Sequence, residues 1–203
     1  MPKVKIKRKS TTTDMTAMCD VAFLLLTFFI LTATARQPEA LEVEIPSSSV
    51  TVKLPDTDIS TLTVGKDKVF FGVVGQDVRI NTLQRIGEQY NIKFTDEEKK
   101  RFSVIENFGV PVASLKQFIA MDNTERMKIN QPGIPCDSGA NNELKQWILQ
   151  ARYATKELHN TDLRFSIKGD SKEEYPTIRK VIDILQDQKI NKFSLITSLE
   201  GVK

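Results

Sequence analysis

Residues 15–35 read MTAMCDVAFLLLTFFILTATA, an apolar run that is interrupted by a single acidic residue, Asp20. At about 1.5 Å per residue, these 21 residues form a helix about 31 Å long, close to the thickness of the hydrocarbon core of a membrane. The strongly apolar side chains favour insertion by roughly 3–5 kcal/mol, and one central aspartate costs roughly 2.5–3.5 kcal/mol. The sequence therefore predicts one transmembrane helix that inserts with Asp20 inside it.

A cleaved secretory signal is the alternative interpretation of the same residues. Residues 1–9 supply a basic n-region, and Ala33 and Ala35 fit a small-x-small cleavage site. Two features argue against a signal. The segment is 35 residues long, slightly beyond the usual range, and an export signal has no use for Asp20.

Four threonines fall on the same face of the predicted helix as Asp20. At 100° per residue they lie within about 40° of the aspartate. They are Thr13, Thr16, Thr27 and Thr34. Such a polar face is typical of a helix that presents a carboxylate to a protein-lined, partly wet path. The alternative is that the hydroxyls only bond carbonyls of their own helix.

The charge distribution excludes several classes of function. Residues 1–35 hold five basic and two acidic side chains, which accounts for the whole formal net charge of +3. The remainder is neutral, which argues against a nucleic-acid surface. With two cysteines, Cys19 and Cys136, one histidine and no catalytic or nucleotide-binding motif, we expect no enzyme, no metal and no cofactor. The basic tail predicts an N-terminus on the cytoplasmic side.

The segment that follows the helix, residues 36–58, predicts an extended periplasmic tether. It is rich in proline and serine, and it carries two short alternating patterns. The apolar positions of these patterns are candidates for pairing with a strand of a partner protein. They are Leu41, Val43, Ile45, Val50 and Val52. An ordinary linker is the alternative.

Residues 59–203 predict a small two-layer α+β domain. The predicted elements are, in chain order, a β-hairpin over 59–74, helices over 77–90, 96–108, 115–121 and 143–158, a strand over 163–168, a helix from Pro176 and a strand over 193–197. Capping boxes are predicted at Thr95 with Glu98 and at Ser114 with Gln117. A loop is expected over 130–142.

Three finer expectations concern this domain. Residues 76–141 carry charges of both signs and are interpreted as a mostly solvated helical insertion. The helix over 143–158 is predicted to bury one side, made of Leu144, Trp147, Ile148, Ala151 and Leu158. His159 is interpreted as a surface residue at a helix end, because no Cys, Asp or His cluster surrounds it in the sequence.

Two stretches of the sequence resemble the ExbD/TolR family. The first is residues 16–21, TAMCDV, followed by the Leu/Phe-rich run, with Ala17 where the family usually has a proline. The second is IKGDSKEEYPTIRKVIDILQDQKINKFSLIT, residues 167–197, which is similar to the last strand-helix-strand of the family. The resemblance implies a single-pass inner-membrane protein, N-terminus cytoplasmic over residues 1–14 and C-terminal domain periplasmic, in which Asp20 is the protonatable residue.

The resemblance also implies a function and partners. The chain is expected to act as an ExbD-like subunit of a motor driven by the proton motive force, which energises outer-membrane transport through a TonB-like transducer. It is expected to form a homodimer inside a ring of an ExbB/TolQ-like channel subunit, in contact with membrane lipid. The alternatives are a TolR-like subunit that serves envelope integrity, and an anchored or secreted envelope-binding module without a motor role.

Overall fold

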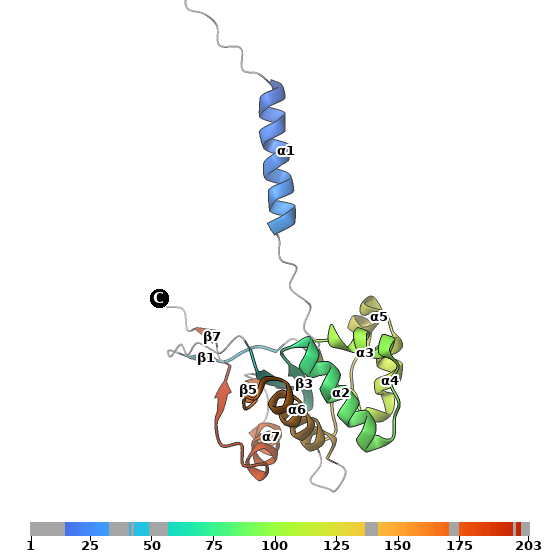
Figure 1. Cartoon of the computed structure of the whole chain (residues 1–203). Helices are drawn as coiled ribbons and strands as arrows, with labels where there is room; N and C mark the ends of the chain where they lie inside the picture. The colour runs from blue at the N-terminus through green and yellow to red at the C-terminus, as the bar shows by residue number, and fades with distance from the viewer. Residues whose placement is uncertain are drawn as a thin grey trace, which may run out of the picture. The chain divides into compact units, whose positions relative to one another are not determined.

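The structure, a computed structural model, describes residues 15–32, 41, 43–48, 57–136, 142–170, 175–196 and 198–199 of the 203-residue chain. The chain divides into two compact units, residues 1–37 and residues 38–203. The first contains one helix, α1, and the second contains a sheet with the remaining helices (Figure 1). One N-terminal apolar helix followed by a mixed α/β domain is the predicted fold class, which is confirmed.

Helix α1 spans Met15–Thr32, and residues 33–35 of the predicted span lie outside the described residues. The sequence of α1 has neither proline nor glycine to break it. Its 18 residues reach about 27 Å at about 1.5 Å per residue. None of its side chains is buried, and its length and composition suit a helix that crosses a membrane.

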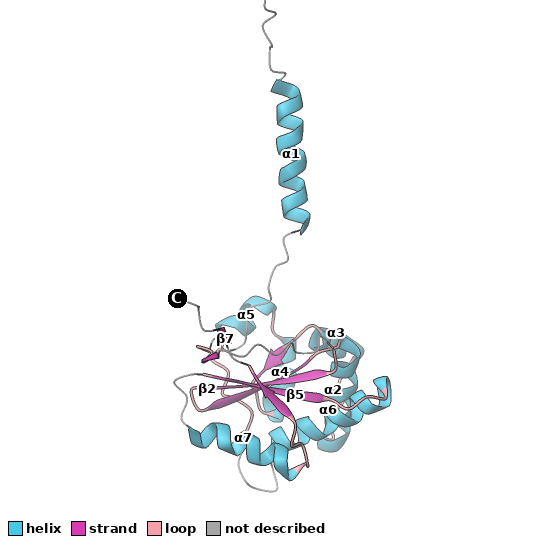
Figure 2. Cartoon of the chain, turned by 90° about the vertical axis from the view of Figure 1, so that its left-hand side faces the viewer, coloured by secondary structure: helices cyan, strands magenta, loops and turns pink. Residues whose placement is uncertain are grey.

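A five-stranded sheet forms the centre of the domain, with the strand order β4-β3-β2-β5-β6 (Figure 2). The strands are β2 (Ile59–Gly65), β3 (Lys68–Val73), β4 (Asn107–Phe108), β5 (Arg164–Gly169) and β6 (Phe193–Leu195). β3 pairs antiparallel with β2 and β4, whereas β5 pairs parallel with β2 and β6. The sheet is therefore mixed, with a hairpin on one side and parallel strands on the other.

The predicted hairpin is confirmed as β2 and β3. Its turn residues Lys66 and Asp67 have φ values of 54° and 57°. Positive φ at both central positions is the geometry of a type I′ turn, whose twist matches that of the two strands. The Asp67 carboxylate also accepts a hydrogen bond from the Thr177 hydroxyl at 3.1 Å, which ties the turn to the helix that begins at Tyr175.

Six helices accompany this sheet among the described residues. They are α2 (Gln76–Tyr90), α3 (Asp96–Ser103), α4 (Val112–Ala120), α5 (Asn123–Lys128), α6 (Glu143–His159) and α7 (Tyr175–Asp187). α7 connects the parallel neighbours β5 and β6, as a crossover between parallel strands requires. α2 packs against both α6 and α3.

The two faces of the sheet differ in polarity because side chains alternate along a strand. Leu62, Phe71 and Ile167 share one buried cluster with Trp147 of α6 and Leu185 of α7. On the alternate positions of β2 and β5, the hydroxyls of Thr61 and Ser166 lie 3.1 Å apart and bond each other. The apolar face thus packs on helices, in agreement with the predicted two-layer arrangement.

The expectation of a mostly solvated insertion over residues 76–141 is wrong for the described residues. Leu83 and Ile86 of α2 and Leu115 of α4 are completely buried, and β4 extends the central sheet. The charged residues that suggested solvation lie in one short helix, α3, where Glu97, Lys100 and Arg101 are exposed. This region therefore builds a large part of the core.

Several element boundaries in this region also differ from the prediction. The helix expected over 96–108 ends at Ser103, and Asn107–Phe108 instead forms β4 because it pairs with β3. The capping box at Thr95 and Glu98 is confirmed, whereas Ser114 lies inside α4, which begins after Pro111. A further capping box, at Asp122 and Glu125, begins the unpredicted helix α5.

The long helix α6 agrees with the prediction except at its C-terminal end. Leu144, Trp147, Ile148 and Ala151 are buried, but Leu158 is 43% exposed. The buried residues of α6 end at Thr155, Leu158 lies in the exposed last turn, and Asn160 ends the helix in the left-handed conformation at φ 54°. The predicted loop over 130–142 is irregular over 130–136, and residues 137–141 lie outside the described residues.

The described part of the expected tether packs on the domain. Residues 43–46 form no strand, and Leu41, Val43 and Ile45 are half-buried. A Cβ atom on Gly65 would lie only 2.8 Å from Val43 Cγ1 and 3.1 Å from Leu41 Cδ2, so glycine is needed for this close approach. The segment thus covers the end of β2 instead of standing apart from the core.

A short strand follows this segment where the sequence suggested only a break. β1 (Ser47–Ser48) pairs parallel with β7 (Ser198–Leu199) near the C-terminus of the chain. The two strands lie side by side in Figure 1. Of the predicted strand over 193–197, β6 covers Phe193–Leu195, the Ile196 amide still donates to the Ile167 carbonyl of β5 at 2.9 Å, and residue 197 lies outside the described residues. Val50 and Val52 lie outside the described residues.

Candidate functional site

Asp20 lies in the second turn of α1, and its side chain is exposed on the surface of this unit. By helical pitch, Thr16 and Thr27 lie on the same face. Thr13 and Thr34, the other two residues of the predicted polar face, lie outside the described residues. Asp20 is the only charged side chain of α1.

Two threonine hydroxyls of α1, those of Thr27 and Thr32, bond within the helix. Thr27 donates to the carbonyl of Leu24 at 2.9 Å, and Thr32 donates to the carbonyl of Phe28 at 2.8 Å. These bonds match the alternative weighed from the sequence, in which threonine hydroxyls satisfy carbonyls of their own helix. They leave the lone pairs of each hydroxyl available to a donor on a neighbouring surface.

The candidates for pairing with a partner strand occupy different positions. Leu41, Val43 and Ile45 contribute to the half-buried segment over β2, and Glu44 between them is exposed. The neighbouring backbone at Ser47 and Ser48 already pairs with β7 of the same chain. A partner strand that pairs with β1 must therefore add to its other edge or displace β7.

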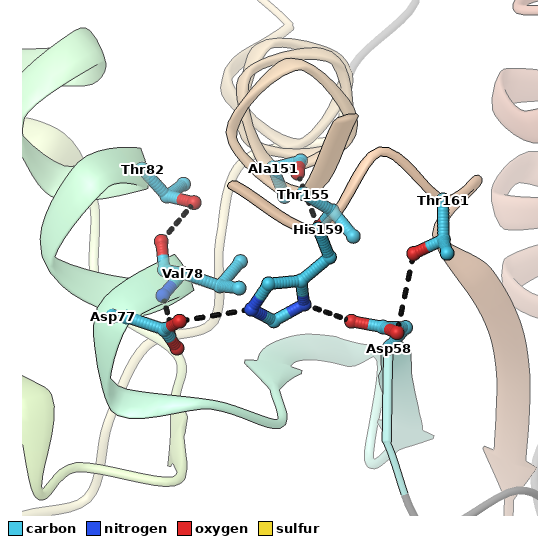
Figure 3. A network of polar contacts seen from close by, with 8 residues as sticks. All are labelled: Asp58, Asp77, Val78, Thr82, Ala151, Thr155, His159 and Thr161. Atoms are coloured by element: carbon cyan, nitrogen blue, oxygen red, sulfur yellow. Dashed lines mark hydrogen bonds and ion pairs between the residues drawn. The ribbon is translucent and has the colours of Figure 1, made fainter. Parts of the chain in front are cut away.

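A polar network that the sequence did not reveal joins three distant parts of the domain (Figure 3). The imidazole of His159, the last residue of α6, lies between two carboxylates. Its Nδ1 bonds Oδ1 of Asp58, which directly precedes β2, and its Nε2 lies 2.9 Å from Oδ2 of Asp77 in the first turn of α2. His159 is thus at a helix end, as predicted, but it binds two acidic residues.

Each carboxylate of this network has a further partner. The Thr161 hydroxyl donates to Asp58 Oδ2 at 3.2 Å, and the Val78 amide donates to Asp77 Oδ1 at 2.9 Å. The hydrogen bonds to Asp58 and then to Asp77 raise the pKa of His159 above its ordinary value of 6.5. The hydrogen bond to His159 lowers the pKa of Asp77 below 3.8.

The network is not a metal site. Within the described part of the chain, no three His, Cys, Asp or Glu side chains are arranged to hold a metal ion. Both ring nitrogens of His159 are already directed at carboxylate oxygens. Cys136 is partly buried against the hydrophobic core instead of facing this network.

These observations define a class of protein with one apolar helix fit to anchor a chain in a membrane and a separate mixed α/β domain. The family model described as biopolymer transport protein ExbD/TolR matches residues 7–200, which is nearly the whole chain. The chain therefore belongs to the ExbD/TolR family, as the resemblance predicted. Comparison with curated proteins and with solved structures finds no match.

Membership of the family defines the general kind of activity. Family members are non-enzymatic subunits of energy-transducing transport systems, and as a kind they work with ExbB/TolQ-like and TonB/TolA-like partners. The apolar helix α1 fits a membrane anchor in such a protein.

Proposed function

We propose that this protein is an ExbD-like motor subunit in which Asp20 takes up and releases protons as they cross the inner membrane. The observation that carries the proposal is the family match over residues 7–200, which includes both Asp20 and the folded domain. The motor energises outer-membrane transport through a TonB-like transducer. No cofactor or metal takes part in this proposal.

The energy source follows from the charge that Asp20 adds to an apolar helix. Holding the carboxylate ionised among apolar groups is costly, so it exchanges a proton with whichever side of the membrane is in contact with it. Each elementary charge that crosses the full field releases about 2.3 kcal/mol per 100 mV. Two α1 helices, one from each protomer of a homodimer, would then move against a surrounding ring of ExbB/TolQ-like subunits.

A TolR-like role is the second candidate, because the matching family model covers both kinds of protein. The two roles share the motor aspartate and differ in the process that is driven. The test is a strain that lacks this gene, complemented with the full chain. Restored growth on a nutrient that requires energised outer-membrane uptake supports the ExbD-like role, whereas restored resistance to detergents without restored uptake supports the TolR-like role. If neither is restored, an anchored module without a motor function is favoured.

The proposed orientation places residues 1–14 in the cytoplasm and the domain in the periplasm. Five basic residues precede α1, and Arg36 is the only basic residue shortly after it. A periplasm-active reporter fused after Lys203 is expected to be active, and a cytoplasm-active reporter at the same position is expected to be silent. The opposite pattern of reporter activity would contradict this orientation.

The finer proposal for residues 41–52 is that they bind a partner through backbone pairing. Its support is the alternation of apolar residues and the second edge of β1, which pairs with no strand of the described residues. Val43 is half-buried, and a Cβ added to Gly65 would lie 2.8 Å from its Cγ1, so docking of a partner strand would begin from a segment that already lies against β2.

A further inference from the structure

We propose that Asp58, His159 and Asp77 form a proton-dependent latch, which fastens the start of β2 to helices α2 and α6. The latch is closed while His159 carries a proton on both ring nitrogens. When His159 loses one of these protons, one of its two hydrogen bonds to a carboxylate is lost, and the latch opens at that contact.

The number of donors and acceptors supports this mechanism. Both ring nitrogens of His159 face carboxylate oxygens, and an ionised carboxylate only accepts hydrogen bonds. A neutral imidazole has one donor nitrogen and one acceptor nitrogen, whereas the imidazolium has two donors. Both contacts are therefore hydrogen bonds only in the charged form. In the neutral form, one nitrogen lone pair faces a carboxylate oxygen.

The bridge that His159 makes between Asp58 and Asp77 acts on the backbone at the start of β2. The Asp58 carbonyl accepts the amide of Arg164 at 2.9 Å, next to the first pair of β2 and β5. Asp58 also has a φ of 54°, a left-handed conformation that is uncommon outside glycine, and its carboxylate is held there by the distant residues His159 and Thr161. The latch thus holds the backbone conformation from which the central strand begins.

The positions of His159 and Asp77 at helix ends favour a protonated imidazole and an ionised carboxylate, which are the charge states of the closed latch. His159 lies at the C-terminus of α6, where a positive charge is favourable, and Asp77 lies in the first turn of α2, where a negative charge is favourable. α2 and α6 pack against each other, so the two ends are held by their own contacts. The bridge therefore adds Asp58 to a pair of helices that is already positioned.

Other charged groups near the network have partners of their own. Lys156 on α6 pairs with Asp162 at 3.3 Å, and Glu157 on α6 bonds Arg85 on α2. The carboxylates of Asp58 and Asp77 are the groups that dominate the electrostatics of the imidazole. Because the side chain of His159 is 32% exposed, it exchanges protons with solvent.

The sign of the pH dependence follows from the direction of the pKa shift. Because the pKa of His159 is raised in the folded protein, its stabilising contribution is fully present below about 6.5. It is lost as the pH rises through the higher folded pKa. The contribution also falls at acid pH, when Asp77 becomes protonated below 3.8. The latch is therefore closed at pH values between the lowered pKa of Asp77 and the raised pKa of His159.

The test is hydrogen exchange of the full chain in detergent micelles, measured from pH 5.5 to pH 9 and corrected for the intrinsic exchange rate. The reporter amides are Arg164, which donates to Asp58, and Val74, which donates to Ile59. Their protection is expected to fall as the pH rises, by up to about tenfold for each pH unit by which the folded pKa of His159 exceeds 6.5. Amides of α7 serve as the internal reference.

The variants distinguish the titration of His159 from that of other groups, since cysteines and the α-amino group also titrate in this pH range. His159→Gln is expected to remove the pH dependence, because His159 is the only histidine of the chain. Asp77→Asn, at a side chain that is 55% exposed, is expected to lower the pKa of His159 and to reduce the change in protection. Asp162→Asn is the matched control and is expected to keep the wild-type profile. A flat wild-type profile, or an unchanged profile in both His159→Gln and Asp77→Asn, would overturn the proposal.

Discussion

Asp20→Asn is expected to abolish growth that depends on energised uptake while the protein still inserts and assembles. Asparagine has nearly the size of aspartate and retains hydrogen-bonding capacity, but it carries no titratable proton. It also lowers the cost of placing this position in a membrane, since it removes a charge that costs roughly 2.5–3.5 kcal/mol at a helix centre. The change thus removes proton exchange and leaves the anchor intact.

Two measurements and two further variants make this prediction specific. Growth is compared in the complemented strain, and co-purification with the channel subunit is measured alongside. Asp20→Glu keeps the titration on a side chain that is longer by one methylene, so partial activity at best is expected. Thr32→Val is the control away from the Asp20 face of α1, and it is expected to retain activity because the Thr32 hydroxyl bonds the Phe28 carbonyl of its own helix. Normal growth of an assembled Asp20→Asn variant would show that the motor proposal is wrong.

Trp147→Ala is expected to cost about 3–5 kcal/mol of the free energy of unfolding of the domain. Trp147 on α6 is completely buried, and its ring centroid lies 4.8 Å from that of Phe108, 6.1 Å from Phe71 and 6.2 Å from Phe102. These rings come from α3, α6 and two strands, so the cavity left by truncation would lie between helices and strands of the core. The free energy of unfolding of a native domain is typically about 5–15 kcal/mol, so a loss of this size removes a large part of it.

Denaturant unfolding of the full chain in detergent, followed by circular dichroism, measures this loss. Fluorescence is unsuitable because Trp147 is the only tryptophan of the chain. Tyr153→Ala on the same helix, at a residue that is 52% exposed, is the matched control and is expected to stay within about 0.5 kcal/mol. Trp147→Phe is expected to cost less than Trp147→Ala, because it keeps a ring and removes an indole Nε1 that is buried without a partner among the described residues. A loss below about 1 kcal/mol for Trp147→Ala would contradict the described packing.

Local patterns in the sequence predicted the elements that depend on neighbours along the chain. The apolar run that contains Asp20 predicts α1, and the turn at Lys66 and Asp67 predicts the hairpin. The amphipathic pattern of Leu144, Trp147, Ile148 and Ala151 predicts α6. In each case the periodicity or turn chemistry is contained within about twenty residues.

The charges of residues 76–141 were a misleading signal. Glu97, Lys100 and Arg101 suggested a solvated helix, and they do lie on the outer side of α3. The same helix nevertheless buries Phe102 beside Trp147. A charge run describes the outer face of a helix, whereas the contribution of the inner face to the core depends on the element that packs against it.

The sequence by itself determined that this chain has one apolar helix with a single carboxylate, a two-layer α+β domain and the family to which it belongs. Only the tertiary structure decided that β1 pairs with β7, that residues 76–136 contribute much of the core, and that His159 lies between Asp58 and Asp77. The two aspartates are 101 and 82 residues away from the histidine along the chain. Their meeting depends on the pairing of β2 with β5 and on the packing of α2 against α6. Such long-range contacts have no local periodicity, because they result from the burial of whole elements against one another.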